Sequence, residues 1–136
     1  MSSLIRVRGG LLRGETGMGD LEGSTNALDV VTAFGAAWGN HDLEATLALI
    51  TDDCLFDDTD PAPDGTAYRG RAAIALAWAP IFADLSSRFE PEETFAVGDR
   101  VIQLWRYSWT GGHVRGVDVF RVTNGKVAEK LSYVKG

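Results

Sequence analysis

Apolar residues recur every three or four positions in the first half of the chain, a spacing typical of amphipathic helices. The pattern predicts helices over Asn26–Gly39 and Arg71–Leu85, with a short helix between them that begins after Asp42 and continues to Ile50. Asp42 suits an N-cap, because its short side chain can accept a hydrogen bond from a free N–H of the first turn. Pro80 should kink or shorten the last of these helices, because proline has no N–H to donate.

From residue 88 onward apolar and polar residues alternate, as in strands with one buried face. Gly98-Asp99, Gly111-Gly112 and Asn124-Gly125 are turn signals that divide this region into hairpins. The predicted strands are Cys54–Asp58, ahead of the third helix, and Arg88–Val97, Val101–Thr110, His113–Val122 and Lys126–Val134. Three helices followed by an antiparallel meander predict an α+β domain, in which a curved sheet wraps the helices as a cone.

The chain has 136 residues, which fits one domain over residues 24–136. Residues 1–23 are rich in glycine and lack the continuous apolar run of a signal peptide. We expect them to form a disordered extension, or in part to precede a start at Met18.

A net charge of −6 argues against binding to the phosphates of nucleic acid and to anionic membrane surfaces. No apolar run approaches the roughly 20 residues of a membrane span. The single cysteine, Cys54, cannot form an internal disulfide, which favours a cytoplasmic location. The cluster of aspartates between residues 52 and 64 lacks the regular spacing of a calcium loop, so we predict no metal.

Counting back from the hairpin turns predicts which side chains share the concave face. A two-residue loop at Gly111-Gly112 would pair Thr110 with His113 and place Trp105 opposite Asp118. Alternate residues of a strand share a face, so a layer of side chains follows from this register. Its predicted members are Gln103, Trp105, Tyr107, Gly116, Asp118 and Phe120, and beyond the last turn Val127, Glu129, Leu131 and Tyr133.

Asp118 lies in the middle of this aromatic layer. A buried carboxylate is costly when it is charged and unpaired, which favours a neutral acid able to donate a hydrogen bond or a proton. Two structural alternatives stay open: Asp118 is solvated at the mouth of the cone, or it pairs with an arginine.

Several strings of the sequence resemble SnoaL-like polyketide cyclases, a family of the nuclear transport factor 2-like (NTF2-like) superfamily that also contains ketosteroid isomerases. They are GVDVFR at residues 116–121, NGKVAE at 124–129, ITDDCLFDD at 50–58, YRGRAAI at 68–74 and WGNHDLEATLALI at 38–50. The resemblance spans roughly residues 27–134 and implies an NTF2-like cone. It says less about function, because this fold hosts many activities.

The resemblance implies roles for two carboxylates. Asp118 matches the acid/base of the cyclases and the protonated oxyanion-hole aspartate of the isomerases, and Asp58 resembles the isomerase general base. Phe34 stands where the isomerases have a tyrosine and cannot donate a hydrogen bond, which disfavours the standard isomerase site. Limonene-epoxide hydrolases use an aspartate on the last strand, and Lys126–Val134 contains none.

Other side chains are candidates for binding or proton transfer. His113 could assist proton transfer, although strict alternation points it to the opposite face. Tyr68 and Tyr107 could donate hydrogen bonds to a ligand. The candidates for an apolar lining are Phe34, Trp38, Trp78, Trp105, Phe120 and Leu131. Aromatic residues at helical spacing, however, more often belong to the hydrophobic core.

These features predict acid/base catalysis without a cofactor on a hydrophobic carbonyl compound, by enolisation followed by aldol cyclisation or isomerisation. The alternatives are a non-catalytic module for ligand binding or dimerisation, and a hydrolase or dehydratase that uses the same carboxylates. We also expect a homodimer formed through the opposite, convex sheet face, where the apolar residues are Ile102, Leu104, Val117 and Val119.

Overall fold

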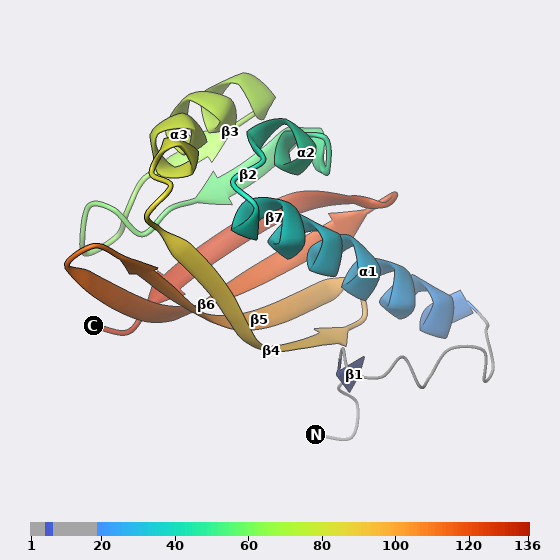
Figure 1. Cartoon of the computed structure of the whole chain (residues 1–136). Helices are drawn as coiled ribbons and strands as arrows, with labels where there is room; N and C mark the ends of the chain where they lie inside the picture. The colour runs from blue at the N-terminus through green and yellow to red at the C-terminus, as the bar shows by residue number, and fades with distance from the viewer. Residues whose placement is uncertain (1–4, 7–18) are drawn as a thin grey trace.

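The computed structural model describes residues 5–6 and 19–136, with side chains from residue 27 onward (Figure 1). The helices of this part are α1 (Gly19–Gly39), α2 (Leu43–Leu47) and α3 (Arg71–Ala83). The strands are β1 (Ile5–Arg6), β2 (Ile50–Asp57), β3 (Ala67–Arg69), β4 (Arg88–Val97), β5 (Arg100–Trp109), β6 (Gly112–Thr123) and β7 (Lys126–Val134). None of the described helices is long and apolar enough to cross a membrane.

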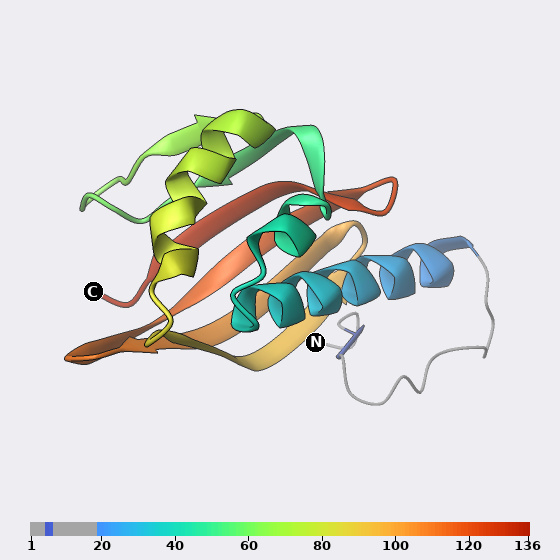
Figure 2. The same ribbon diagram turned by 45° about the horizontal axis from the view of Figure 1, so that its top comes forward.

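The strands form one curved sheet in the order β1-β4-β5-β6-β7-β2-β3. Strands β4 to β7 are the predicted antiparallel meander, while β2 runs parallel to β7 and makes the sheet mixed rather than purely antiparallel. Figure 2 shows the helices lying across one side of the sheet, where α1 packs against β4 to β7 and α3 against β2 and β3. The predicted α+β cone is confirmed, with its sheet left unclosed.

Several boundaries differ from the prediction. Helix α1 begins at Gly19 rather than Asn26, and Ile5–Arg6 pairs with β4, so parts of the expected 1–23 extension are in regular structure. The rest of that extension lies outside the described residues. Ile50 opens β2 instead of extending α2, and β3, which pairs with β2, was not predicted.

Polar side chains join the first helices to the sheet. Asp42 caps α2 as predicted, because its Oδ1 accepts a hydrogen bond from the Ala45 N–H at 3.0 Å. Arg71, the first residue of α3, donates to the carbonyls of Leu47 at 3.2 Å and Ile50 at 2.5 Å. These bonds hold α3 against the start of β2.

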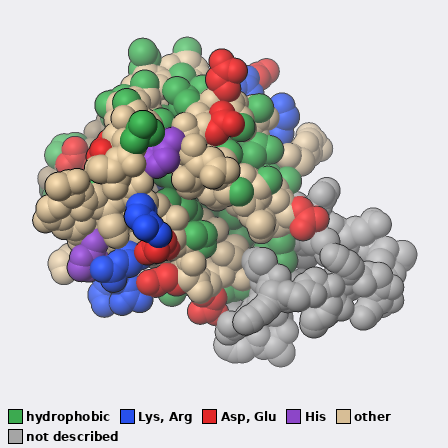
Figure 3. Space-filling model, viewed as in Figure 1, with side chains coloured by type: hydrophobic (Ala, Val, Ile, Leu, Met, Phe, Trp, Pro, Cys, Tyr) green, Lys and Arg blue, Asp and Glu red, His purple; other side chains and the backbone are tan. Residues whose placement is uncertain are grey.

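Aromatic rings fill the space between helices and sheet. Trp78 of α3 is fully buried, with ring centroids 5.8 Å from Phe34, 5.0 Å from Trp38 and 5.5 Å from Phe56. Such tilted and edge-to-face contacts are favoured for aromatic pairs. On the outside, Figure 3 shows hydrophobic side chains over the region of α3, where Leu76 is exposed.

The β5–β6 register differs from the prediction by two residues. The turn is Thr110-Gly111, with Gly111 at φ 105°, and Trp109 rather than Thr110 forms the last pair, opposite Gly112. Asp118 therefore lies opposite Gln103, and Trp105 lies opposite Gly116. A shift of two leaves every side chain on its predicted face, because the period of a strand is two.

The β6–β7 register contains a bulge that reverses the predicted faces of β7. Val122 pairs with Val127 but Arg121 pairs with Glu129, so one extra residue, Ala128, separates the two pairs. Beyond this point Lys130, Ser132 and Val134 turn to the concave side. The prediction that Glu129, Leu131 and Tyr133 lie there is wrong.

Candidate functional site

A cavity of about 440 Å³ lies between the concave face of the sheet, α1, α3 and the loop that follows β2. Aromatic residues are the largest group in its wall. The aromatic lining residues are Phe34, Trp38, Phe56, Tyr68, Phe89, Trp105, Tyr107 and Phe120. The charged ones are Asp58, Asp60, Asp118 and Lys130. A large apolar cavity with a few convergent polar groups is the usual form of a small-molecule site.

Strand pairing places the polar groups in rows across the sheet. Gln103, Asp118 and Ser132 lie side by side on β5, β6 and β7. The next row contains Phe120, Lys130 and Phe56 on β6, β7 and β2. The acid and the ammonium thus come from neighbouring strands one row apart, and the bulge at Ala128 is what turns Lys130 inward.

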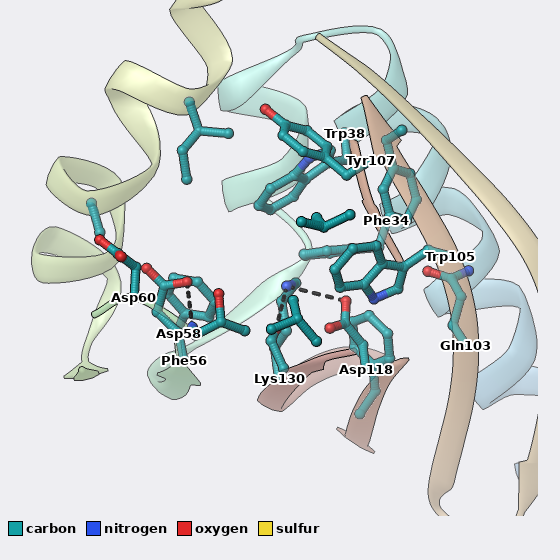
Figure 4. A pocket seen from close by; sticks show the side chains of 18 of the residues that line it. Phe34, Trp38, Phe56, Asp58, Asp60, Gln103, Trp105, Tyr107, Asp118 and Lys130 are labelled. Carbon is teal, nitrogen blue, oxygen red and sulfur yellow. Dashed lines mark hydrogen bonds and ion pairs between the residues drawn. The ribbon is translucent and has the colours of Figure 1, made fainter. Parts of the chain in front are cut away.

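Asp118 and Lys130 form a buried ion pair on the cavity wall (Figure 4). Lys130 Nζ lies 3.2 Å from Asp118 Oδ2, and their relative exposures are 7% and 2%. The ammonium also donates to Ser132 Oγ at 2.9 Å and lies 4.9 Å from the ring centroids of both Trp38 and Phe56. The ion pair and the two ring faces together compensate the lost hydration of the lysine.

Asp58 approaches the same cavity from the loop after β2. Burial raises the pKa of its carboxyl, while the hydrogen bond from the Thr59 N–H (2.7 Å) and the charge of Lys130 lower it by smaller amounts. The Asp58 N–H donates to Thr66 O at 2.9 Å, which closes the loop. A Cβ on Gly65 (φ 75°) would lie only 1.7 Å from Asp58 O, so this closure needs glycine.

Three buried polar atoms of the wall have no hydrogen-bond partner among the described residues. They are Gln103 Oε1, Trp105 Nε1 and Asp118 Oδ1. Leaving such atoms unsatisfied costs free energy, and native structures contain few of them. These atoms give the wall unused donor and acceptor capacity where β5 and β6 meet.

Eight of the predicted site residues line the cavity, and three do not. The eight are Phe34, Trp38, Asp58, Tyr68, Trp105, Tyr107, Asp118 and Phe120. His113 is exposed and pairs with Ser108 on the opposite sheet face, because it lies five residues from Asp118. Trp78 lies behind the lining as core, and the bulge points Leu131 away from the cavity.

Lys130 and Ser132 were missed as site residues for the same reason that Leu131 was wrongly included. A single bulge reverses which side chains of β7 face the cavity. The sequence of the Asn124-Gly125 turn and of Lys126–Val134 gives no indication of this bulge. Neither structural alternative for Asp118 holds as stated, because its side chain is buried and its cation is a lysine from β7 rather than an arginine.

The arrangement can move protons inside a largely apolar space. Asp58 is a carboxylate of raised basicity, suited to take a proton from a bound molecule. The Asp118–Lys130 pair offers a fixed positive charge and an unused carboxylate oxygen on the adjacent wall. An aromatic lining between them can hold the apolar body of a ligand.

Comparison with known proteins identifies a family and a fold. The sequence profile of the SnoaL-like domain matches residues 31–130. No curated protein matches significantly. Among solved structures, an NTF2-like protein of unknown function from Mesorhizobium loti is 38% identical, covers 83% of this chain and 93% of its own, and superposes with a TM-score of 0.77.

Two other solved structures are of proteins with a bound ligand or an assigned activity. A Mycobacterium tuberculosis protein in complex with estradiol-17β-hemisuccinate is 26% identical, with a TM-score of 0.67 and coverage of 79% of this chain and 92% of its own. A Sinorhizobium meliloti protein proposed to be a polyketide cyclase is 22% identical, with a TM-score of 0.67 and coverage of 77% and 94%. The latter shows likeness of fold alone.

Proposed function

Because the chain belongs to the SnoaL-like family of NTF2-like proteins, we propose that it is a cofactor-independent enzyme that enolises a hydrophobic carbonyl compound. Aldol cyclisation or isomerisation would follow. One observation carries the proposal: Asp58 and Asp118 line the same aromatic cavity. Enolisation needs a base for the proton beside the carbonyl and a polar group for the oxygen.

The two ends of the site suit these two tasks. Asp58 takes the proton from the carbon next to the carbonyl, since its raised pKa makes it the stronger base. The electron pair of the broken C–H bond forms the C=C bond, and the carbonyl oxygen becomes an enolate at the Asp118–Lys130 wall. The enolate carbon then takes the proton back at another position, or attacks a second carbonyl within the substrate.

The aromatic lining supports a flat, hydrophobic substrate. Trp38, Trp105 and Tyr107 offer ring surface on several sides of the cavity. The Mycobacterium tuberculosis neighbour was solved with a steroid ester, which supports a ligand of polycyclic size for this cavity as well. We therefore propose a substrate of polycyclic size.

A screen of cyclic and polycyclic ketones tests the proposal, with turnover of the wild type compared with Asp58→Asn and Asp118→Asn. We expect each substitution to lower kcat/KM by about 10²-fold or more, the usual range for loss of a general acid or base. Thermal unfolding of each variant checks that it is folded. Turnover equal to the wild type in both folded variants would exclude the carboxylates from catalysis.

A second candidate is a binding protein without catalysis. The ion pair between Asp118 and Lys130 favours a binding protein, because the pair occupies one Asp118 oxygen that an acid catalyst would use. In that case the same ketones bind, measured by calorimetry, while wild-type protein exchanges no α-proton for deuterium from solvent.

We further propose that two copies associate through the convex sheet face. There Ile102, Leu104, Val117, Val119 and Leu131 form a patch across β5, β6 and β7. The ion pairs of Glu129 with Arg121 (2.7 Å) and Arg100 (3.8 Å) are polar neighbours of this patch. We also propose a cytoplasmic location, which the single cysteine supports.

A further inference from the structure

Lys130 is the one basic residue that lines the described cavity, and it has donor capacity to spare. An ammonium carries three N–H groups. Within the described part of the chain, its oxygen partners are Asp118 Oδ2 and Ser132 Oγ. The third N–H therefore has no oxygen acceptor among these residues; the nearest ring centroids, those of Trp38 and Phe56, lie 4.9 Å from the nitrogen.

Stability alone gives little reason for two charged residues at this place. Buried ion pairs often contribute no more than apolar residues of similar volume, because both groups must be desolvated. Asp118 is already an anionic partner of Lys130, and a methionine at position 130 alone would leave that buried carboxylate without its cation. The observation that points to a ligand is therefore the lysine donor that neither Asp118 nor Ser132 uses, on the wall of an apolar cavity.

The position of the ammonium fits the second task of the site, which is to stabilise the enolate oxygen. Figure 4 shows the Lys130 nitrogen pointing into the cavity between the Asp58 and Asp118 side chains, and its charge acts on Asp58 as well. A substrate that presents its α-carbon to Asp58 can thus place its carbonyl oxygen near Lys130.

We propose that Lys130 is a catalytic residue whose free N–H binds the carbonyl oxygen of the substrate and stabilises it as the enolate; this rests on the proposed function. Asp118 and Ser132 are then positioning residues that hold the ammonium through its other donors. In the step, Asp58 accepts the α-proton, the C–H electron pair forms the C=C bond, and the oxygen takes the carbonyl π electrons beside Lys130. The ammonium keeps its proton, so no other reactant is needed.

A phenol probe tests this inference without turnover, because a phenolate resembles an enolate in shape and charge. Binding of 4-nitrophenol is followed across pH by absorbance, in which its neutral and ionised forms have separate bands. We expect the wild type to bind the phenolate at least about tenfold more tightly than Lys130→Met does, as for a charge-assisted hydrogen bond.

The matched control is Lys126→Met, which removes the same charge from an exposed site on the same strand and should leave binding unchanged. Should Lys130→Met fold poorly, the double variant Lys130→Met/Asp118→Asn removes both charges of the pair and should also lose the phenolate preference. Near-UV circular dichroism monitors the fold of each variant.

Two results overturn the inference: equal phenolate affinity in the folded wild type and the folded Lys130 variants, or tighter binding of the neutral phenol that is lost in Asp118→Asn. The second result would show that the oxygen of the ligand binds to Asp118 rather than to Lys130. The proposed function fails separately, if the ketone screen finds neither turnover nor α-proton exchange while Lys130 still selects the phenolate.

Discussion

At the residue scale, the site depends on how three charged groups act on one another. Asp118 and Lys130 compensate each other at 3.2 Å, whereas Asp58 has no such close cation among the described side chains and keeps a raised pKa. Lys130 still lowers the pKa of Asp58 through its charge, so the base and the proposed oxygen-binding group are coupled. Changing the lysine should therefore change both proton uptake and oxygen binding.

The first prediction concerns this coupling. In a carboxyl-carbon NMR titration, Asp58 should titrate above the ordinary aspartate pKa of 3.8, because burial disfavours its charged form. In Lys130→Met its pKa should rise further, because an attractive positive charge is lost. Lys126→Met serves as the control, with its side chain exposed at the start of β7. An Asp58 pKa that falls in Lys130→Met would contradict the coupling.

The same shift predicts how stability depends on pH. Asp58 binds its proton more tightly in the folded than in the unfolded state, so its stabilising contribution is complete below the unfolded pKa. It is lost as pH rises through the folded pKa. The free energy of unfolding of the wild type, measured relative to Asp58→Asn, should accordingly decrease over that interval; a constant difference would show that the environment of Asp58 does not favour the protonated form.

At the element scale, the sequence predicts the order of helices and strands well because hydrophobic periodicity is a local property. The bounds of β4 and β7 are the predicted ones, and Asp42 caps α2 as expected. The face that carries Asp118 was also predicted correctly, although the β5–β6 turn is displaced by one residue, because the resulting shift of two preserves faces.

Features that depend on tertiary pairing could not be predicted in the same way. The Ala128 bulge turns Lys130 inward, and alternation alone assigned it to the outside. Strand β3 is three residues long and forms against β2, so its sequence carries too few positions for a period to emerge. Lys130 and Ser132 were missed as site residues because their place on the concave face depends on that one extra residue.

Gly116 provides a test at this scale. A Cβ at this position would lie 2.2 Å from Tyr133 O and 2.6 Å from Trp105 Cζ2, so the indole of Trp105 packs over bare backbone. Gly116→Ala should destabilise the protein by about 1–3 kcal/mol, as other overpacking substitutions do, and displace Trp105 in the cavity. Urea denaturation measures the first effect and tryptophan fluorescence the second.

The matched control for Gly116→Ala is Gly112→Ala on the same strand. Its added Cβ would meet only a side chain, Trp109 Cζ2, at 3.3 Å, and that side chain is partly exposed and can move. Equal midpoints of unfolding for the two variants would show that the close approach at Gly116 is relieved without cost.

At the scale of the whole molecule, the two faces of the curved sheet differ in their surroundings. Its concave face, together with the helices, encloses the cavity. Its convex face carries the apolar patch of Leu104, Val117, Val119 and their neighbours, whose side chains are partly exposed. Apolar patches of this kind, rimmed by charges, often mark protein interfaces, and an isologous dimer would cover this one while leaving the cavity accessible.

The last prediction is that light scattering after size-exclusion chromatography gives twice the 14.7-kDa mass of the chain. Leu104→Glu, on the β5 side of the convex patch, should shift the protein to the monomer, because a charge buried against an apolar partner surface has no counter-ion. Leu76→Glu, on the exposed side of α3, introduces the same charge elsewhere and should remain dimeric. The convex patch would have no role in assembly if the wild type were monomeric. The same would follow if Leu76→Glu, and not Leu104→Glu, gave the monomer.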